Sequence, residues 1–144
     1  MKEKLYTIPL NDAVNANDEC PFCFIERKLE QDLMDFVLGS GSSYMESDIR
    51  SETDKAGFCR SHFKKMFDYG NSLGNALIMQ TYMIGLRKEL DAQLDAFEPP
   101  AKKGLFSKKQ EEDLPLLQWL RRKNSTCYLC NKIDYNMNRY YATF

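Results

Sequence analysis

The sequence predicts an all-α fold. Apolar residues recur at spacings of three and four over several long stretches of its 144 residues, which is the pattern of a helix with one buried face. No stretch shows the sustained alternation of polar and β-branched apolar residues that is typical of a strand. The hydrophobic content of 43% is enough for the core of one domain of this length. We therefore expect helices with little or no sheet.

The first half of the chain is expected to hold four helical segments. An N-cap signal at 17–19 and a proline at position 21 favour a long helix that ends at a glycine- and serine-rich run. The expected segments cover 9–14, 21–38, 44–52 and a stretch from Cys59 that carries Phe63, Met66 and Phe67 on one face, with a polar turn at 53–57.

The second half is expected to hold the longest helix and two shorter ones. An apolar stripe marks a helix over about 72–97, and two prolines directly after it terminate it. Residues 99–113 then have the composition of a flexible linker. A short amphipathic helix over 114–123 has Trp119 as its anchor, and a last helix begins near Cys127.

Charge and hydropathy exclude two classes of partner. The chain has 20 basic and 21 acidic residues and a net charge of -1, without the clustered basic excess of proteins that bind nucleic acid. No run of about 18 apolar residues is present, so no membrane-spanning helix is expected. The N-terminus also lacks the apolar segment and cleavage site of a signal peptide. We expect a cytoplasmic protein that binds neither nucleic acid nor membrane.

The cysteines indicate a metal site. Cys20 and Cys23 form a Cys-x-x-Cys pair, and Cys59 and His62 form a Cys-x-x-His pair, each at an expected helix start. Residues three apart on a helix share a face, so each pair can point at one ion, and the helix N-terminus favours the thiolate. Three cysteines and one histidine are a common tetrahedral ligand set for zinc. We therefore predict a helical domain pinned by a Cys3His site with these four ligands.

Other interpretations of these residues remain open. The cysteines can be buried core residues and His62 a surface imidazole, or the ligands can hold an iron–sulfur cluster instead of zinc. A catalytic zinc is disfavoured because four protein ligands leave no open coordination position. Redox chemistry at a Cys-x-x-Cys pair is the main alternative, although thioredoxin-like proteins place this motif after a strand. No catalytic residue is assigned.

A further pair, Cys127 and Cys130, opens the last expected helix and has no Cys-x-x-His after it. It can be the half-site of a truncated second unit, it can join its counterpart from a second chain in a four-thiolate site, or it can stay reduced and unliganded. We take truncation as the working hypothesis. The aromatic residues of this helix can drive self-association or can pack onto helix 72–97; they are Tyr128, Tyr135, Tyr140, Tyr141 and Phe144.

Three sequence motifs carry a family resemblance. The segments Cys20-Pro21-Phe22-Cys23, Gly57-Phe58-Cys59-Arg60-Ser61-His62-Phe63 and Asn71-Ser72-Leu73-Gly74-Asn75-Ala76-Leu77 resemble an uncharacterised bacterial domain-of-unknown-function family. The resemblance spans roughly 17–144. Its members carry the Cys-Pro-x-Cys and Gly-Phe-Cys-x-x-His unit twice, which implies that the second unit here is present only as its first pair. The resemblance implies no reaction.

These observations lead to one functional hypothesis and one alternative. We expect a non-enzymatic zinc-binding helical module for protein interaction or scaffolding, with an unknown protein partner or a second copy as its ligand. The alternative is a cytosolic thiol redox or metal- and redox-sensing protein. The expected organisation is a metal-pinned helical domain at 1–98, the linker at 99–113, and a helical segment at 114–144 that packs on the same domain and starts a truncated second unit.

Overall fold

The computed structural model describes residues 7–41, 43–98 and 114–144, and every regular element in these ranges is helical. This confirms the all-α prediction, while the expected linker at 99–113 lies outside the described residues. None of the described helices is both long enough and apolar enough to cross a membrane. The elements are α1 (Thr7–Asn15), α2 (Pro21–Leu38), the 3-10 turn η1 (Ser43–Met45), α3 (Ser47–Ala56), α4 (Arg60–Asp68), α5 (Ser72–Asp95), α6 (Pro115–Ser125) and α7 (Tyr128–Thr143).

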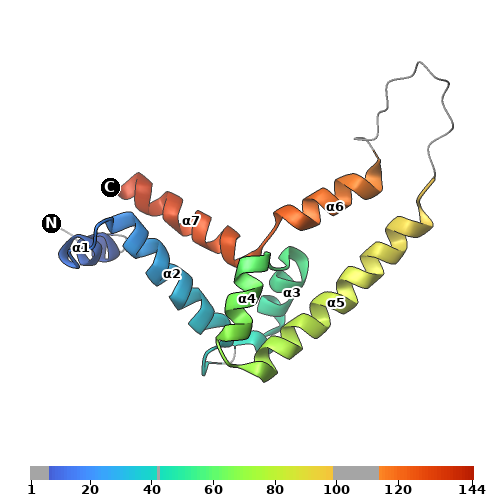
Figure 1. Cartoon of the computed structure of the whole chain (residues 1–144), viewed down its shortest axis with the longest axis horizontal. Helices are drawn as coiled ribbons and strands as arrows, with labels where there is room; N and C mark the ends of the chain where they lie inside the picture. The colour runs from blue at the N-terminus through green and yellow to red at the C-terminus, as the bar shows by residue number, and fades with distance from the viewer. Residues whose placement is uncertain (1–6, 42, 99–113) are drawn as a thin grey trace, which may run out of the picture.

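The helices form two arms that meet at α3 and α4 (Figure 1). In one arm α7 packs along α2, and α1 contacts both of them. In the other arm α6 lies against α5, whose opposite end packs on α3. The last helix therefore packs mainly on α2 and also contacts α1 and α3, rather than lying along the helix at 72–97. Because the two arms meet at α3 and α4, the starts of α4 and α7 come together at the junction.

Local signals explain where most helices begin. Cys20 is the N-cap of α2, its sulfur accepts a hydrogen bond from the backbone N–H of Cys23, and Pro21 occupies the first turn. Asn71 caps α5, where its side-chain oxygen accepts from the N–H of Gly74 at 2.9 Å. The expected polar turn at 53–57 is wrong, because α3 continues to Ala56. The helix ends there because Gly57 has a φ of 66° and its N–H bonds to the carbonyl of Thr53.

Two groups of buried side chains form the core. The larger group lies where the arms meet; it comprises Met34, Val37, Leu38, Tyr44, Met66, Ile78, Cys127, Tyr128 and Leu129. The smaller group joins α1, α2 and α7; it comprises Leu10, Ala13, Ile25, Ile133 and Met137. Both groups place residues of α7 against residues of α2, so the last helix is part of the core.

The expected apolar stripe of α5 is mostly not buried. Only Gly74, Asn75 and Ile78 of this helix are buried, while Leu73 and Met83 are exposed. On α4, likewise, Met66 is buried but Phe63 and Phe67 are exposed. Periodicity thus located these helices but did not show which apolar side chains have packing partners.

Helix α6 is anchored as expected from its tryptophan. Trp119 is buried, and its indole N–H donates to the carboxylate of Glu89 on α5 at 3.0 Å. Lys123 donates to the same carboxylate at 2.9 Å, and the pKa of Glu89 is lowered by this contact, despite partial burial, and further by the Trp119 hydrogen bond. The contact of α6 with α5 is therefore defined by an aromatic anchor and a charge-assisted hydrogen bond.

Candidate metal centre

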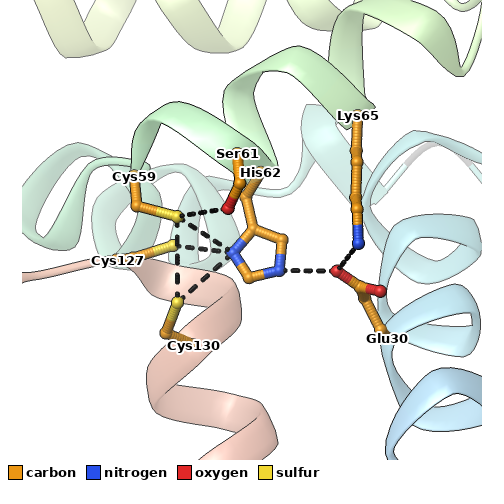
Figure 2. A network of polar contacts seen from close by, with 7 residues as sticks. All are labelled: Glu30, Cys59, Ser61, His62, Lys65, Cys127 and Cys130. Carbon is orange, nitrogen blue, oxygen red and sulfur yellow. Dashed lines mark hydrogen bonds and ion pairs between the residues drawn. The ribbon is translucent and has the colours of Figure 1, made fainter.

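Two pairs of ligand residues meet at the junction of the arms. Cys59 is the N-cap of α4 and His62 lies in its first turn, while Cys127 is the N-cap of α7 and Cys130 lies in its first turn. Their ligand atoms all lie within 4.8 Å of one another (Figure 2). His62 and Cys127 are buried, and Cys59 and Cys130 are partly buried. This Cys3His group can hold a metal ion.

The distances within the group match one tetrahedral ion. The Nδ1 atom of His62 lies 3.3 Å from each of the three sulfur atoms, and the sulfurs of Cys59 and Cys130 are 3.9 Å apart. Zinc bonds of about 2.3 Å to sulfur and about 2.0 Å to nitrogen, at tetrahedral angles, place two sulfurs roughly 3.8 Å apart and a sulfur and a nitrogen roughly 3.5 Å apart. These four distances are thus close to those that a single ion requires, and all four donor atoms lie within 4.8 Å of one another.

A glycine and a backbone hydrogen bond hold the two pairs together. Gly57 adopts a positive φ of 66°, which turns the chain from the end of α3 towards Cys59. Its carbonyl accepts a hydrogen bond from the N–H of Tyr128, the first residue of α7, at 2.9 Å. Tyr128 is itself buried in the core and adjoins Cys127. The backbone therefore fixes the start of α7 beside the start of α4 without any contribution from the ligands.

His62 is oriented from its other side by a carboxylate. Its Nε2 atom lies 2.9 Å from Oε1 of Glu30 on α2, and Lys65 donates to the same oxygen at 2.5 Å. The ionised carboxylate is an acceptor only, so Nε2 carries the proton and donates it, and Nδ1 is left with the lone pair that faces the sulfurs. Metal-binding histidines commonly have such a carboxylate partner. Burial opposes ionisation of Glu30, but Lys65 and His62 together hold its pKa below the ordinary value.

The thiols of the group differ in how readily they ionise. Burial disfavours the thiolate of Cys59, but hydrogen bonds from the Ser61 side chain and the His62 backbone, followed by those from Cys127 and Cys130, lower its pKa to about 6. Burial and the neighbouring sulfurs of Cys127 and Cys59 raise the pKa of Cys130 to about 12. One thiolate therefore forms readily, and its charge disfavours ionisation of the neighbouring thiol, because like charges repel at this distance. A bound dication removes that opposition.

The comparison with known families identifies the chain at the level of family. A family model described as a family of unknown function matches residues 1–144. The chain belongs to DUF6062. No curated protein and no solved structure matches it. The resemblance to a domain-of-unknown-function family is thus confirmed, and the repeat of the two-pair unit stays a prediction. Membership of DUF6062 brings no activity with it, so the function has to be argued from the site.

The DUF6062 chain combines its ligand pairs differently from the expectation based on sequence. The structure brings Cys59 and His62 together with Cys127 and Cys130, and does not place Cys20 or Cys23 in this group. Cys20 and Cys23 form a disulfide with each other at the start of α2. Cys127 and Cys130, which were expected to be at most a half-site, are therefore in the group. Cys20 and Cys23, which were expected to be ligands together with Cys59 and His62, lie elsewhere.

The antiparallel packing of α2 and α7 explains this arrangement. The ring of Phe22, at the start of α2, lies 4.9 Å from that of Tyr141 and 5.2 Å from that of Phe144 at the end of α7. Cys130 lies at the opposite end of α7, eleven residues before Tyr141, which corresponds to about 16 Å of helix. A pair at the start of α2 is therefore too far from Cys130 to share an ion with it.

One residue of the DUF6062 site was not found from the sequence. Glu30 lies in the middle of α2, among other charged residues, and no motif distinguishes it from them. Its role becomes visible only when α2 packs beside α4 and brings its carboxylate to His62. The four ligand residues, by contrast, all belong to Cys-x-x-Cys or Cys-x-x-His pairs that are recognisable in the sequence.

Proposed function

We propose that this protein is a zinc-binding helical module in which Cys59, His62, Cys127 and Cys130 hold one structural zinc ion. The observation that carries the proposal is the tetrahedral spacing of one nitrogen and three sulfur donors. Thiolate and imidazole ligands suit zinc, whereas magnesium and calcium take oxygen ligands. An iron–sulfur cluster distributes its protein ligands over several iron atoms, so donor atoms that converge on one point favour a single ion.

The zinc is proposed to be structural, not catalytic. Four protein ligands fill a tetrahedral ion and leave no position for water or substrate. The site also lies directly beside the larger core group, to which Cys127 itself belongs. It connects His62 to a cysteine 65 residues further along the chain, so the ion closes a long loop of the polypeptide. Binding of the ion therefore contributes to the stability of the fold.

The module is proposed to act by binding another protein or a second copy of itself. Support comes from apolar side chains that the described part of the chain leaves exposed. Phe144 is 80% exposed and Tyr141 is 53% exposed at the end of α7. Further exposed apolar residues lie along α5; they are Leu73, Met83, Ile84 and Leu94. Exposed apolar side chains of this kind are available to a partner at both places.

Metal content tests the zinc site directly. The protein is purified without chelator, and its metal is measured by elemental analysis together with its native mass. We expect one zinc per chain. The Cys127→Ser variant is expected to lose it, whereas the Cys20→Ser/Cys23→Ser double variant is expected to retain it. Loss of zinc from the double variant with retention in Cys127→Ser would contradict the ligand set.

Native mass as a function of concentration tests the interaction role. A dimer that forms at higher protein concentration, and is weakened in a Tyr141→Ser/Phe144→Ser variant with unchanged zinc content, supports self-association through α7. The matched control is Tyr135→Ser, because Tyr135 is equally exposed on the same helix, at 60%, but lies away from its end. Equal weakening by the control would contradict a specific contact at the end of α7.

A further inference from the structure

Cys20 and Cys23 lie outside the metal centre and are joined by the disulfide that the structure shows among the described residues. The other cysteines, Cys59, Cys127 and Cys130, are free thiols at the metal centre. We propose that Cys20 and Cys23 form a reversible thiol–disulfide exchange centre that works independently of the metal. Its proposed substrate is a pair of cysteine thiols on a protein or peptide without acidic neighbours. The proposal goes beyond the structural zinc site.

The two sulfurs occupy different positions at the start of α2. Cys20 is the N-cap residue and is half-buried, and its sulfur accepts the backbone N–H of Cys23 at 3.1 Å. That hydrogen bond and the N-terminal end of an 18-residue helix stabilise negative charge on the Cys20 sulfur. Cys23 lies in the first turn and is exposed. Cys20 is therefore the better leaving group, and Cys23 is the sulfur that an incoming thiolate can reach.

The exchange follows from these positions. A substrate thiolate attacks the sulfur of Cys23, a mixed disulfide forms, and the bond between the two cysteines breaks with its electron pair on Cys20. The second substrate thiolate then attacks the substrate sulfur of the mixed disulfide and releases Cys23 as a thiolate. Two substrate thiols become one disulfide, and their two protons end on Cys20 and Cys23. The reverse sequence reduces a substrate disulfide.

The surroundings of the pair favour a substrate without negative charge. Glu19 precedes Cys20 directly, and Glu26 lies one helical turn beyond Cys23; both are exposed. The positive charge of Arg27 is engaged by Asp18. An anionic thiol such as glutathione therefore approaches like charges. Phe22, packed with Tyr141 and the exposed Phe144, adds aromatic surface beside the pair, on which an apolar peptide segment can lie.

The test uses the full chain loaded with zinc, so that the other three cysteines are protected as ligands. The protein is equilibrated in mixtures of reduced and oxidised dithiothreitol, free thiols are alkylated, and the sites are located by peptide mass spectrometry. Cys20 and Cys23 are expected to convert together, in a single two-electron transition, while the zinc content stays constant. A pair that remains oxidised over the whole range, or a reduced pair that binds a second zinc ion per chain, would overturn the proposal.

Single variants test the assignment of the two sulfurs. When treated with a small disulfide, the Cys20→Ser variant is expected to accumulate a mixed disulfide on Cys23. At alkaline pH, where both residues are thiolates, the Cys23→Ser variant is expected to form one on Cys20 more slowly, because that sulfur is less accessible. Equal rates would contradict the roles given to the two residues. If the chain purified without chelator holds no zinc and the pair still cycles, the metal proposal fails and the exchange proposal stands.

The charge of the reducing thiol tests the substrate class. Reduction of the wild-type disulfide is followed with cysteamine, 2-mercaptoethanol and 3-mercaptopropionate, each normalised to its rate on a free small disulfide. The cationic thiol is expected to be the fastest and the anionic thiol the slowest, and a Glu19→Gln/Glu26→Gln variant is expected to reduce this difference. The same order in the variant as in the wild type, with unchanged ratios, would overturn the preference.

Discussion

Glu30 provides the most direct test of how the metal centre is built. Its carboxylate accepts the Nε2 proton of His62 at 2.9 Å and so presents Nδ1 to the three sulfurs. Lys65, which binds the same oxygen, is 53% exposed and can return to water when the carboxylate is removed. The Glu30→Ala change therefore acts mainly on the orientation and basicity of the imidazole. It replaces none of the four metal-ligand residues.

The expected magnitude follows from the loss of one hydrogen-bonded partner of a ligand. Such a loss lowers metal affinity about 10- to 100-fold, which corresponds to about 1.4–2.7 kcal/mol of binding free energy. Glu30→Gln is expected to cost less, under about tenfold, because its amide oxygen can still accept the Nε2 proton although the negative charge is gone. Zinc affinity is thus expected to decrease in the order wild type, Glu30→Gln, Glu30→Ala. The first step measures the effect of the negative charge, and the second measures the effect of the hydrogen bond to His62.

Competition with a chromophoric zinc chelator measures these affinities. The matched control is Glu52→Ala, because Glu52 also pairs with a lysine, Lys132 at 2.8 Å, and does not contact His62. The control is expected to bind zinc as the wild type does. Equal affinities of Glu30→Ala and Glu52→Ala would refute the role of Glu30, and so would a Gln variant weaker than the Ala variant.

Two further predictions concern the backbone and the protons of the site. Gly57→Ala is expected to lower the free energy of unfolding by about 1–3 kcal/mol in chemical denaturation, because φ is 66° and a Cβ would lie 2.7 Å from the Tyr82 hydroxyl. Gly85→Ala, in open space on α5, should instead raise it by about 0.5–1 kcal/mol, and the opposite order would refute the argument. In zinc-free protein the pKa of Cys59 is lowered from 9.0 to about 6, so its contribution to stability is present above pH 9 and is lost as the pH falls to 6. The pKa of Cys130 is raised to about 12, so its contribution to stability is present below pH 9 and is lost as the pH rises to 12. The free energy of unfolding, measured by chemical denaturation at each pH, should therefore have a maximum near pH 9. The Cys59→Ser variant should show a smaller decrease in this free energy between pH 9 and pH 6.

Local signals made the helices predictable. The limits of α2 agree with the expectation because Pro21 and the glycine after Leu38 are local sequence features. The N-cap itself is Cys20 and not a residue of the expected signal at 17–19. The end of α3 was misjudged because its last turn is polar, and a polar stretch does not distinguish a turn from an exposed helix. The exposed face of α5 was also not predictable, since periodicity does not show whether an apolar face has a partner.

The combination of ligand pairs was beyond the reach of local signals. Cys20 with Cys23 and Cys127 with Cys130 have the same spacing, and both begin at the N-cap of a helix. Either pair can supply the two thiolates that complete a four-ligand site with Cys59 and His62. The sequence-based expectation chose the first pair because a Cys-x-x-His pair follows it, and this pair is also separated from Cys59 by a shorter stretch of chain. The cost of closing a longer loop grows only slowly with its length, so proximity was weak support.

Packing contacts that involve no metal ligand decide which of the two Cys-x-x-Cys pairs lies beside His62. The hydrogen bond from Tyr128 to the carbonyl of Gly57 places the start of α7 beside α4, and the contact of Phe22 with Tyr141 places the start of α2 at the far end of α7. The second contact reflects the antiparallel packing of α2 and α7, and the first joins α7 to the residue that ends α3. The packing therefore leaves one Cys-x-x-Cys pair to complete the metal centre and keeps the other away from it, at the start of α2, where its two sulfurs form a disulfide. A change that weakens the packing of α2 on α7 should disturb both centres, whereas removal of a metal ion bound by the Cys3His group should leave the disulfide pair in place at the start of α2.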